Sequence, residues 1–476
     1  MKGTAGIIAV GSDHNPDQNS RQSRAGLRCA GGGRCRGKGE IKAVTNGTLH
    51  IGLSIAVTWL TNDAWRRPES GVEGIFSSEF YVDLAKRAEK AKLDFLFRPD
   101  TLFLAPETVA VSPGFSSLDP TVLLAAVARE TEFIGLVSTA STTFNPPFVV
   151  ARQLQSLNWI SGGRVGWNVV TSLDGQQNFG VEAMPPAEER YARADEFVDL
   201  VRKLWQSYPN EALSIDREAG RFADVSRVRP VNHKGAHFSV AGPLNVPSAG
   251  AEIPLFQAGA SPTGRDFAAG IADAVFAAAP DPEAGAELRQ DLRERAVAHG
   301  RGEEAPLVLP GLSLYLADTK AEAEALFAAT HARQDPARRF KAIEALIGVD
   351  LAEASPDQRV TIESLPALRA DVRSRTHADL LRRYIARTAP TVRDLLERPE
   401  VIGSAHWLVV GTVDDAYREI RAWAEAGAAD GFIALPGGSP RSLDLFLDEL
   451  VPRLAQAGLF RREYSGATLS SHLRER

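Results

Sequence analysis

Segments with the pattern of buried strands alternate with segments of helical pattern along most of this chain. Helical patterns cover Ser78 to Leu93, Phe148 to Ile160 and Glu188 to Trp205. A further helix is expected to begin at Pro120, with Asp119 as its N-terminal cap. The apolar, strand-like stretches are Leu49 to Val57, Asp94 to Arg98, Phe133 to Ala140, Arg164 to Val170, Pro254 to Ala258, Ala274 to Ala279, Leu307 to Ala317 and Gly431 to Leu435. Strands joined by helices run parallel, and eight of them close a barrel. The sequence therefore predicts the α/β class and a (β/α)8 TIM barrel.

Two long stretches interrupt this alternation. Residues 206–252 are rich in Pro, Gly and His, whereas residues 331–404 are charged and have a helical period. Long loops in a compact domain usually act as lids or interface elements. We therefore expect one barrel domain over residues 49–476, with both insertions lying over its carboxyl-end face, where barrels bind ligands.

The first 48 residues differ from the rest in composition. They are dense in Gly, Ser, Asn and Arg, show no strand or helix period, and hold both cysteines, Cys29 and Cys35. We expect this stretch to be disordered or a non-native extension. A cysteine-free globular part fits the reducing cytoplasm. The net charge of −6 argues against nucleic acid as a partner, and no run approaches the roughly 20 apolar residues of a membrane span.

One motif is long enough to indicate a family. Residues 161–180 read SGGRVGWNVVTSLDGQQNFG, and ERY follows at Glu189 to Tyr191. Gly162 and Gly163 make a tight turn into a buried strand that ends in a loop of hydroxyls and amides. From about Gly47 to Leu473 the chain resembles the bacterial-luciferase superfamily, in the branch of nitrilotriacetate monooxygenase component A and dibenzothiophene-sulfone monooxygenase.

This resemblance implies a TIM-barrel, flavin-dependent monooxygenase. Members of the branch receive reduced FMN (FMNH2) from a separate NAD(P)H:flavin reductase, so the chain would be the oxygenase component of a two-component system. It would form a 4a-peroxyflavin with O2 and insert one oxygen atom into a small organic substrate. The fold also resembles proteins that assemble as homodimers or homotetramers. Neither nucleic acid nor a membrane is expected as a partner.

The phosphate of FMN needs hydroxyls and backbone N–H groups, which a helix start supplies. QAGASPTG, at Gln257 to Gly264, ends a strand and opens a helix, and its resemblance to a family motif implies Ser261 as a phosphate ligand. Tyr191 is similar to the family's flavin-phosphate tyrosine. Ala187 stands where the family motif has histidine, so one cofactor contact is missing or comes from elsewhere.

The flavin ring is expected at the strand ends. Thr139, in STASTT, resembles a known flavin contact, and Asp100 in FRPDTLF keeps the acid of the commoner family motif L-A-D-x-L. Asn168, an amide within an apolar strand, is either a cofactor ligand or a barrel residue with its hydrogen bonds satisfied. Trp65, in DAWRRP, resembles a family loop and either walls the substrate cavity or packs locally.

Several points stay open in the sequence. We expect no metal, because His233 and His237 lack the H-E-x-x-H context of a zinc site. The catalytic base is unassigned, since the family's histidine upstream of Trp65 is absent. We expect His377 and His406 to be solvated, although a lid could bring either one to the active site. The alternatives are a deazaflavin-dependent hydride-transfer oxidoreductase and a non-catalytic flavin-binding protein.

Overall fold

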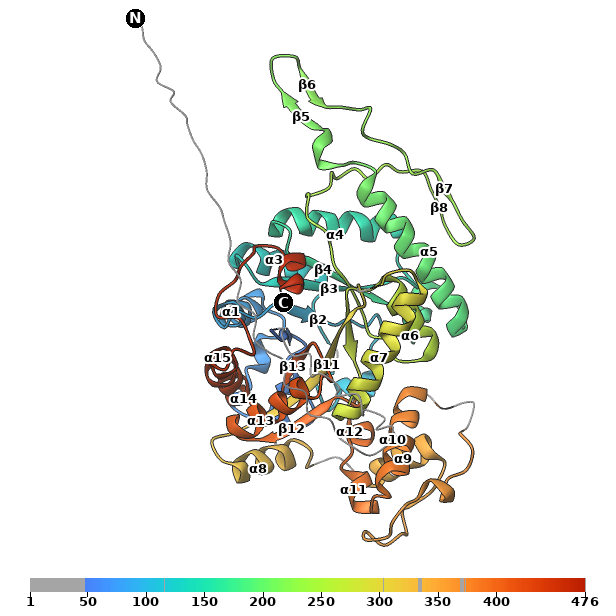
Figure 1. Cartoon of the computed structure of the whole chain (residues 1–476), viewed down its shortest axis with the longest axis vertical. Helices are drawn as coiled ribbons and strands as arrows, with labels where there is room; N and C mark the ends of the chain where they lie inside the picture. The colour runs from blue at the N-terminus through green and yellow to red at the C-terminus, as the bar shows by residue number, and fades with distance from the viewer. Residues whose placement is uncertain are drawn as a thin grey trace, which may run out of the picture. The chain divides into compact units, whose positions relative to one another are not determined.

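A closed ring of eight parallel strands forms the centre of the computed structural model (Figure 1). The structure describes residues 48–114, 116–302, 304–332, 336–368, 372 and 374–475. The ring runs β1-β2-β3-β4-β9-β10-β11-β13 and closes between β13 and β1, where Ile51 lies opposite Phe432. The predicted TIM barrel is confirmed. Among the described helices, none is long and apolar enough to cross a bilayer.

The ring strands lie where the apolar stretches predict them. Their bounds are β1 His50–Ser54, β2 Phe95–Arg98, β3 Gly135–Ser141, β4 Val165–Val170, β9 Leu255–Gln257, β10 Ala274–Ala277, β11 Leu307–Leu316 and β13 Gly431–Pro436. A ninth strand, β12 (Trp407–Gly411), pairs with the second half of β11. This strand was not predicted from the sequence.

Helices surround the ring, and several begin with side-chain caps. The main ones are α1 Ser78–Lys90, α3 Pro120–Glu130, α4 Pro147–Ser161, α5 Ala187–Gln206, α6 Pro262–Ile271, α7 Pro282–Ala298, α8 Lys320–Thr330, α13 Val413–Glu425, α14 Pro440–Leu445 and α15 Val451–Gln456. Asp119 accepts from the N–H of Val122 over 3.0 Å, so its predicted capping of α3 is confirmed. α2 (Pro106–Val109) is a short turn of helix in the loop after β2.

Aromatic and aliphatic side chains fill the inside of the ring. Phe95, Phe97 and Phe256 belong to this cluster, and the C-terminal helix α16 (Leu469–Arg474) adds Leu469. A Cβ on Gly135 or Gly166 would lie 2.6 or 2.7 Å from Leu469, so only glycine leaves room for it. The C-terminal tail therefore closes the amino-end side of the barrel.

The first insertion lies elsewhere than predicted. It forms two hairpins, β5 (Leu213–Asp216) with β6 (Arg221–Ala223) and β7 (His233–Lys234) with β8 (Ser239–Val240). It follows the end of α5, and Trp159 near the end of α4 donates to the carbonyl of Pro247 over 2.7 Å. In a βα barrel the helices end beside the amino ends of the strands. The expectation that residues 206–252 cover the carboxyl-end face is therefore wrong, because the insertion follows a helix and not a strand. In Figure 1 the two hairpins extend from the end of α5.

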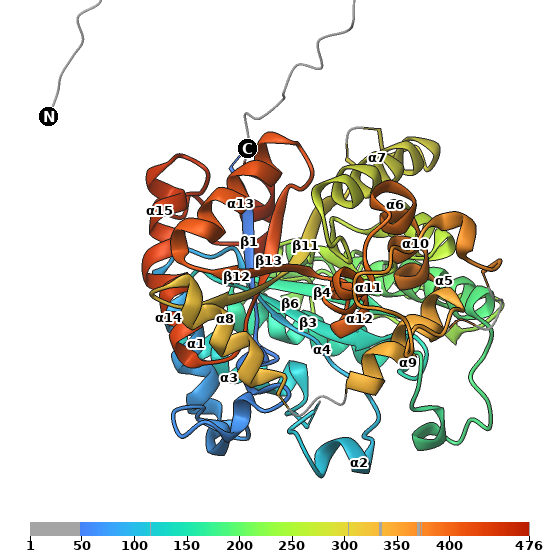
Figure 2. The ribbon, with the colours of Figure 1, turned by 90° about the horizontal axis from the view of Figure 1, so that it is seen from below.

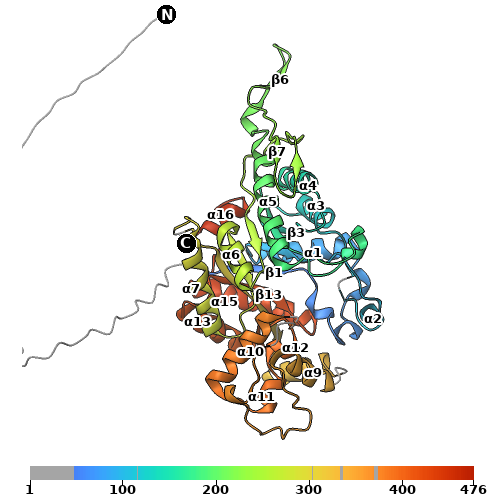
Figure 3. The ribbon, with the colours of Figure 1, turned by 90° about the vertical axis from the view of Figure 1, so that its right-hand side faces the viewer.

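The second insertion is helical, as predicted. Its helices are α9 Pro336–Ile347, α10 Arg375–Thr388, α11 Val392–Leu396 and α12 Pro399–Ile402, and they share a hydrophobic cluster of their own. Arg387 of α10 forms an ion pair of 2.9 Å with Asp281, the cap of α7 directly after β10. This insertion thus attaches at the carboxyl ends of the strands, and Figures 2 and 3 show α10 to α12 grouped together there.

Candidate active site

Two predicted site residues meet inside the ring at the carboxyl ends of β3 and β4. Thr139 and Asn168 lie opposite each other in the strand register. The Asn168 Nδ2 donates to the Thr139 hydroxyl over 2.9 Å, and that hydroxyl donates to the carbonyl of Arg98 over 2.7 Å. The Asn168 Oδ1 is buried and has no hydrogen-bond partner among the described residues. Buried acceptors are nearly always paired in folded proteins, so an unpaired one indicates that a ligand donates to it.

Two other predicted residues meet at the start of α6. Ser261 caps this helix, and its hydroxyl accepts from the N–H of Gly264 over 3.1 Å. Tyr191 reaches the same turn from α5: a Cβ on Gly264 would lie 2.7 Å from the Tyr191 hydroxyl. The Tyr191 ring packs edge-on against Phe267 at 5.5 Å. Two hydroxyls and the N–H of Thr263 in the first turn of the helix therefore surround one spot, which suits an anion.

The strand register relates these two pairs to each other. Asn168 on β4 is followed by Val169, which lies opposite Gln257 at the end of β9. The turn after Gln257 leads to Ser261 within four residues. All four groups thus lie at the carboxyl ends of adjacent parallel strands, which is where barrel enzymes bind their ligands.

Asp100 follows β2 and lies two residues beyond the carbonyl that Thr139 contacts. Its side chain is partly buried. Burial raises the pKa of Asp100 to about 6; the nearby Asp119 acts in the same direction, while the N–H of Thr101 and Arg98 oppose it. A carboxyl group with this pKa exists in both protonation states near neutral pH, so it can donate or accept a hydrogen bond.

His406 is a site residue that the sequence analysis placed wrongly. Its ring stacks on Phe276 of β10 with centroids 5.1 Å apart, and a Cβ on Gly311 would lie 2.5 Å from its Nδ1. That nitrogen is shielded from solvent and has no partner among the described residues. Burial lowers the pKa of His406 to about 4, and His377 adds to the effect. The expectation of a solvated surface histidine is therefore wrong: His406 is a neutral imidazole at the barrel mouth.

Comparison with known proteins identifies the family. The model of the luciferase-like monooxygenases matches residues 57–430. This chain belongs to the luciferase-like monooxygenase family. It is a flavin-dependent monooxygenase by class, and the resemblance noted in its sequence motifs is confirmed.

Three relatives illustrate how far the similarity extends. N-acetyl-S-(2-succino)cysteine monooxygenase of Bacillus subtilis is 34% identical over 89% of this chain and 96% of its own length. Nitrilotriacetate monooxygenase component A of Aminobacter aminovorans is 34% identical over 90% of this chain and 96% of its own. The structure of EDTA monooxygenase from Chelativorans sp. BNC1 aligns with a TM-score of 0.76 at 30% identity, covering 90% of this chain and 99% of that one.

Trp65 lies in the loop after β1, outside the contacts described so far. Its indole N–H donates to the carbonyl of Val111 over 3.0 Å, and its own carbonyl accepts from Ser70 over 2.8 Å. It thereby joins the loop after β1 to the loop after β2. It does not line the pocket between these loops, so its assignment to the substrate stays a prediction.

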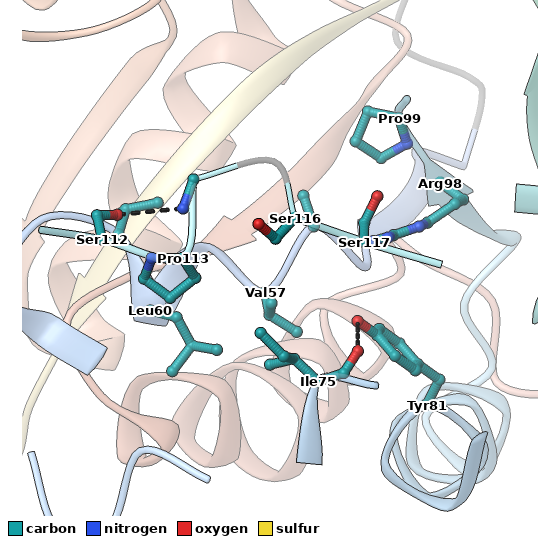
Figure 4. Close-up of a pocket in the computed structure, with 13 residues that line it drawn as sticks. Val57, Leu60, Ile75, Tyr81, Arg98, Pro99, Ser112, Pro113, Ser116 and Ser117 are labelled. Carbon is teal, nitrogen blue, oxygen red and sulfur yellow. Dashed lines mark hydrogen bonds between the residues drawn. The ribbon is translucent and has the colours of Figure 1, made fainter. Parts of the chain in front are cut away.

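That pocket opens at the carboxyl ends of β1 and β2 in this luciferase-like barrel (Figure 4). Arg98 and Tyr81 line one side, and the hydroxyls of Ser116 and Ser117 line another. The sequence analysis assigned no role to Arg98. A signal was present in FLFR, because an arginine that continues a buried apolar strand must itself be buried or end in a cavity.

The paired histidines of the first insertion have a structural partner. Glu196 of α5 contacts His233 Nε2 at 2.9 Å and accepts from the N–H groups of His237 and Phe238. It fastens the β7–β8 hairpin to the helix. Within the described ranges, no three His, Cys, Asp or Glu side chains form a group that could hold a metal ion.

Proposed function

We propose that this chain is the FMNH2-dependent oxygenase component of a two-component monooxygenase. It takes reduced FMN from a separate NAD(P)H:flavin reductase, in the cytoplasm, and inserts one oxygen atom from O2 into a small organic substrate. The observation that carries the proposal is the Oδ1 of Asn168, which is buried without a hydrogen-bond partner among the described residues of a luciferase-like barrel. An acceptor buried without a partner costs about 1–3 kcal/mol, so it implies a donor that arrives with a ligand.

The residues fit a flavin mononucleotide at two separate points. At the start of α6, Ser261 and Tyr191 would hold the phosphate together with the backbone N–H of Thr263. At the ends of β3 and β4, Asn168 and Thr139 would hold the polar edge of the ring, with Asp100 beside them. The absence of a histidine at Ala187 is compatible with this, because Ser261, Tyr191 and the helix start already supply donors.

The remaining tasks of the chain are exclusion of water and orientation. Phe97 and Phe276 lie 5.1 Å apart inside the ring, and His406 stacks on Phe276, so an apolar wall faces the mouth. Bound reduced flavin would supply the two electrons with which O2 is split between the substrate and water. His406 stays neutral at physiological pH because burial lowers its pKa to about 4, so it is a weak proton acceptor whose Nδ1 can form a hydrogen bond with a ligand.

The test supplies purified protein with NADH, a flavin reductase, FMN and candidate thioethers, sulfones and amino carboxylates under labelled O2. We expect one labelled oxygen atom in the product of at least one substrate. Turnover that needs a deazaflavin and consumes no O2 would instead support hydride transfer. Flavin binding without turnover of any candidate would support a non-catalytic role. Size-exclusion chromatography with light scattering tests the expected dimer or tetramer.

A further inference from the structure

Arg98 carries a buried guanidinium that is only partly hydrogen-bonded. The residue ends β2 and is 2% exposed. Its Nη1 donates to the carbonyl of Ile55 over 2.7 Å, whereas Nε and Nη2 have no acceptor among the described residues. Arginine keeps its charge in proteins even where burial lowers its pKa, as it does here. A buried cation without a counterion is costly, so its presence calls for a ligand that compensates it.

The groups around Arg98 do not neutralise it. In the part of the chain that the structure describes, no ion pair includes Arg98; Asp100 attracts it without forming a salt bridge. Tyr81 lies with its ring centre 5.4 Å from the guanidinium carbon and, like Asp100, acts to raise the pKa of Arg98, but it is a neutral side chain whose hydroxyl donates a hydrogen bond to the carbonyl of Ile75 over 2.9 Å. The charge of Arg98 is therefore available to an anion in the adjoining pocket.

The pocket is built for a small polar group that carries an apolar tail. Hydroxyls of Ser112, Ser116 and Ser117 line it beside Arg98, while Leu60 and Ile75 form an apolar side. Figure 4 shows the Arg98 side chain extending toward Ser117. The cavity of about 30 Å³ has room for one carboxylate or about two waters. A planar guanidinium with two free donor atoms matches the two oxygens of a carboxylate.

We propose that this pocket binds a carboxylate of the organic substrate, so that the enzyme oxygenates carboxylic acids and Arg98 is the residue that selects them. This inference rests on the proposed monooxygenase function. The pocket opens at the same end of the barrel as the expected flavin: the backbone carbonyl of Arg98 accepts the hydrogen bond from Thr139, while the Arg98 side chain lies on the other face of β2, beside Tyr81 of α1. A substrate held by its carboxylate at the end of β2 would extend its remaining atoms toward the mouth of the ring.

The test compares an acid with its neutral analogue on the full-length protein loaded with FMN. The probes are 3-(methylthio)propanoate and 3-(methylthio)propanamide, titrated calorimetrically at one ionic strength. We expect the acid to bind at least tenfold more tightly than the amide. Arg98→Met should reduce the affinity for the acid to that for the amide, and Arg98→Lys should retain part of the preference. Arg152→Met, on the exposed side of α4, should change neither affinity.

Two further measurements keep the inference separate from the proposed function. Arg98→Met should bind FMN with the affinity of the wild type. If the wild type does not bind FMN at all, the proposed function is contradicted, but the carboxylate site of Arg98 is not. If Arg98→Met does not fold, Ser117→Asp tests whether Arg98 binds the acid, because the introduced carboxylate would pair with the Arg98 guanidinium and abolish acid binding. Equal affinities of the wild type for acid and amide would overturn the inference and leave a pocket that holds only water. Unchanged acid binding in folded Arg98→Met or Ser117→Asp would overturn it as well.

Discussion

The amide of Asn168 donates to the hydroxyl of Thr139 over 2.9 Å, and the other end of the amide, its Oδ1, has no partner among the described residues. The Thr139 hydroxyl donates its hydrogen bond to the carbonyl of Arg98, so toward Asn168 it can only act as an acceptor. The Asn168 Oδ1 is therefore fixed as the free acceptor. An amide that served packing alone would have both ends paired.

Asn168→Leu should accordingly separate binding from stability. Without flavin, we expect the variant to be as stable as the wild type or more stable, because a buried oxygen without a partner is removed. Its affinity for FMN should fall by about 10- to 100-fold, the equivalent of one lost hydrogen bond of about 1.4–2.8 kcal/mol. Quenching of flavin fluorescence and thermal unfolding of the apoprotein measure the two effects. Asn210→Ala, in the first insertion, is the matched control. A variant that is destabilised but binds FMN normally would show that the amide is structural.

The hydroxyl of Tyr191 should act on the phosphate and not on the ring. Tyr191→Phe keeps the edge-on contact with Phe267 but removes the donor at the start of α6. A hydrogen bond to a charged group contributes about 1.5–3 kcal/mol, so FMN affinity should fall by at least tenfold while riboflavin affinity stays the same. Parallel titrations with the two flavins measure this, with Tyr417→Phe on α13 as the control. Equal losses for both flavins would remove Tyr191 from the phosphate site.

The ring could be predicted from the sequence because buried parallel strands appear as short apolar runs. All eight runs became ring strands. β12 was not predicted, because its sequence WLVVG follows a long helical insertion and the strand pairs outside the closed ring of eight. The position of residues 206–252 was misjudged because a periodicity argument identifies elements but not which end of the barrel a connection joins. That end follows from whether the insertion comes after a strand or after a helix.

The site could be predicted only where a motif named its residues. Thr139 and Asn168 lie in strands that can be recognised from the sequence, and the parallel pairing of β3 with β4 places them opposite each other. Arg98 was missed, and His406 was expected in solvent unless a lid brought it to the active site, because the role of each depends on burial: a histidine before a strand and an arginine at a strand end usually face solvent. Only the three-dimensional structure shows Phe276 against the ring of His406 and the free donors of Arg98.

The raised pKa of Asp100 predicts how stability depends on pH. Its folded pKa of about 6 lies above the ordinary value of 3.8, so the folded state binds the proton more tightly than the unfolded state. The contribution of Asp100 to stability is therefore largest below pH 3.8 and is lost as the pH rises through 6. Asp100→Asn should stabilise the protein at pH 8 by about 1 kcal/mol, a figure reduced for solvent screening of a partly exposed group. At pH 4.5 the gain should fall to about a third of this value. Thermal unfolding of both forms at the two pH values measures this; an equal gain at both would exclude titration of Asp100 as the cause.

At the opposite end of the barrel, a buried ion pair fastens the C-terminal tail. Asp94, which is fully buried, contacts Arg461 Nη2 at 2.6 Å and His50 Nδ1 at 3.0 Å, and it accepts from the N–H of Ile51 over 2.7 Å. Burial acts to raise the pKa of Asp94, but His50, Arg461 and the N–H of Ile51 outweigh it and the net direction is downward. The contribution of this group is present above pH 3.8 and is lost as the pH falls through the lower, folded pKa.

Arg461→Met should therefore be strongly destabilising at pH 7. It leaves the Asp94 carboxylate buried without its arginine partner, and breaking a buried pair in this way costs about 3–5 kcal/mol. Adding Asp94→Asn to Arg461→Met should recover part of the loss, because the unpaired charge is then removed as well. Urea unfolding of both variants measures the two changes, and Arg462→Met, on the exposed neighbour, should differ from the wild type by less than about 0.5 kcal/mol. If the double variant is less stable than Arg461→Met alone, the charge of Asp94 is not what Arg461 compensates, and the tail is held by Leu469 and its apolar contacts instead.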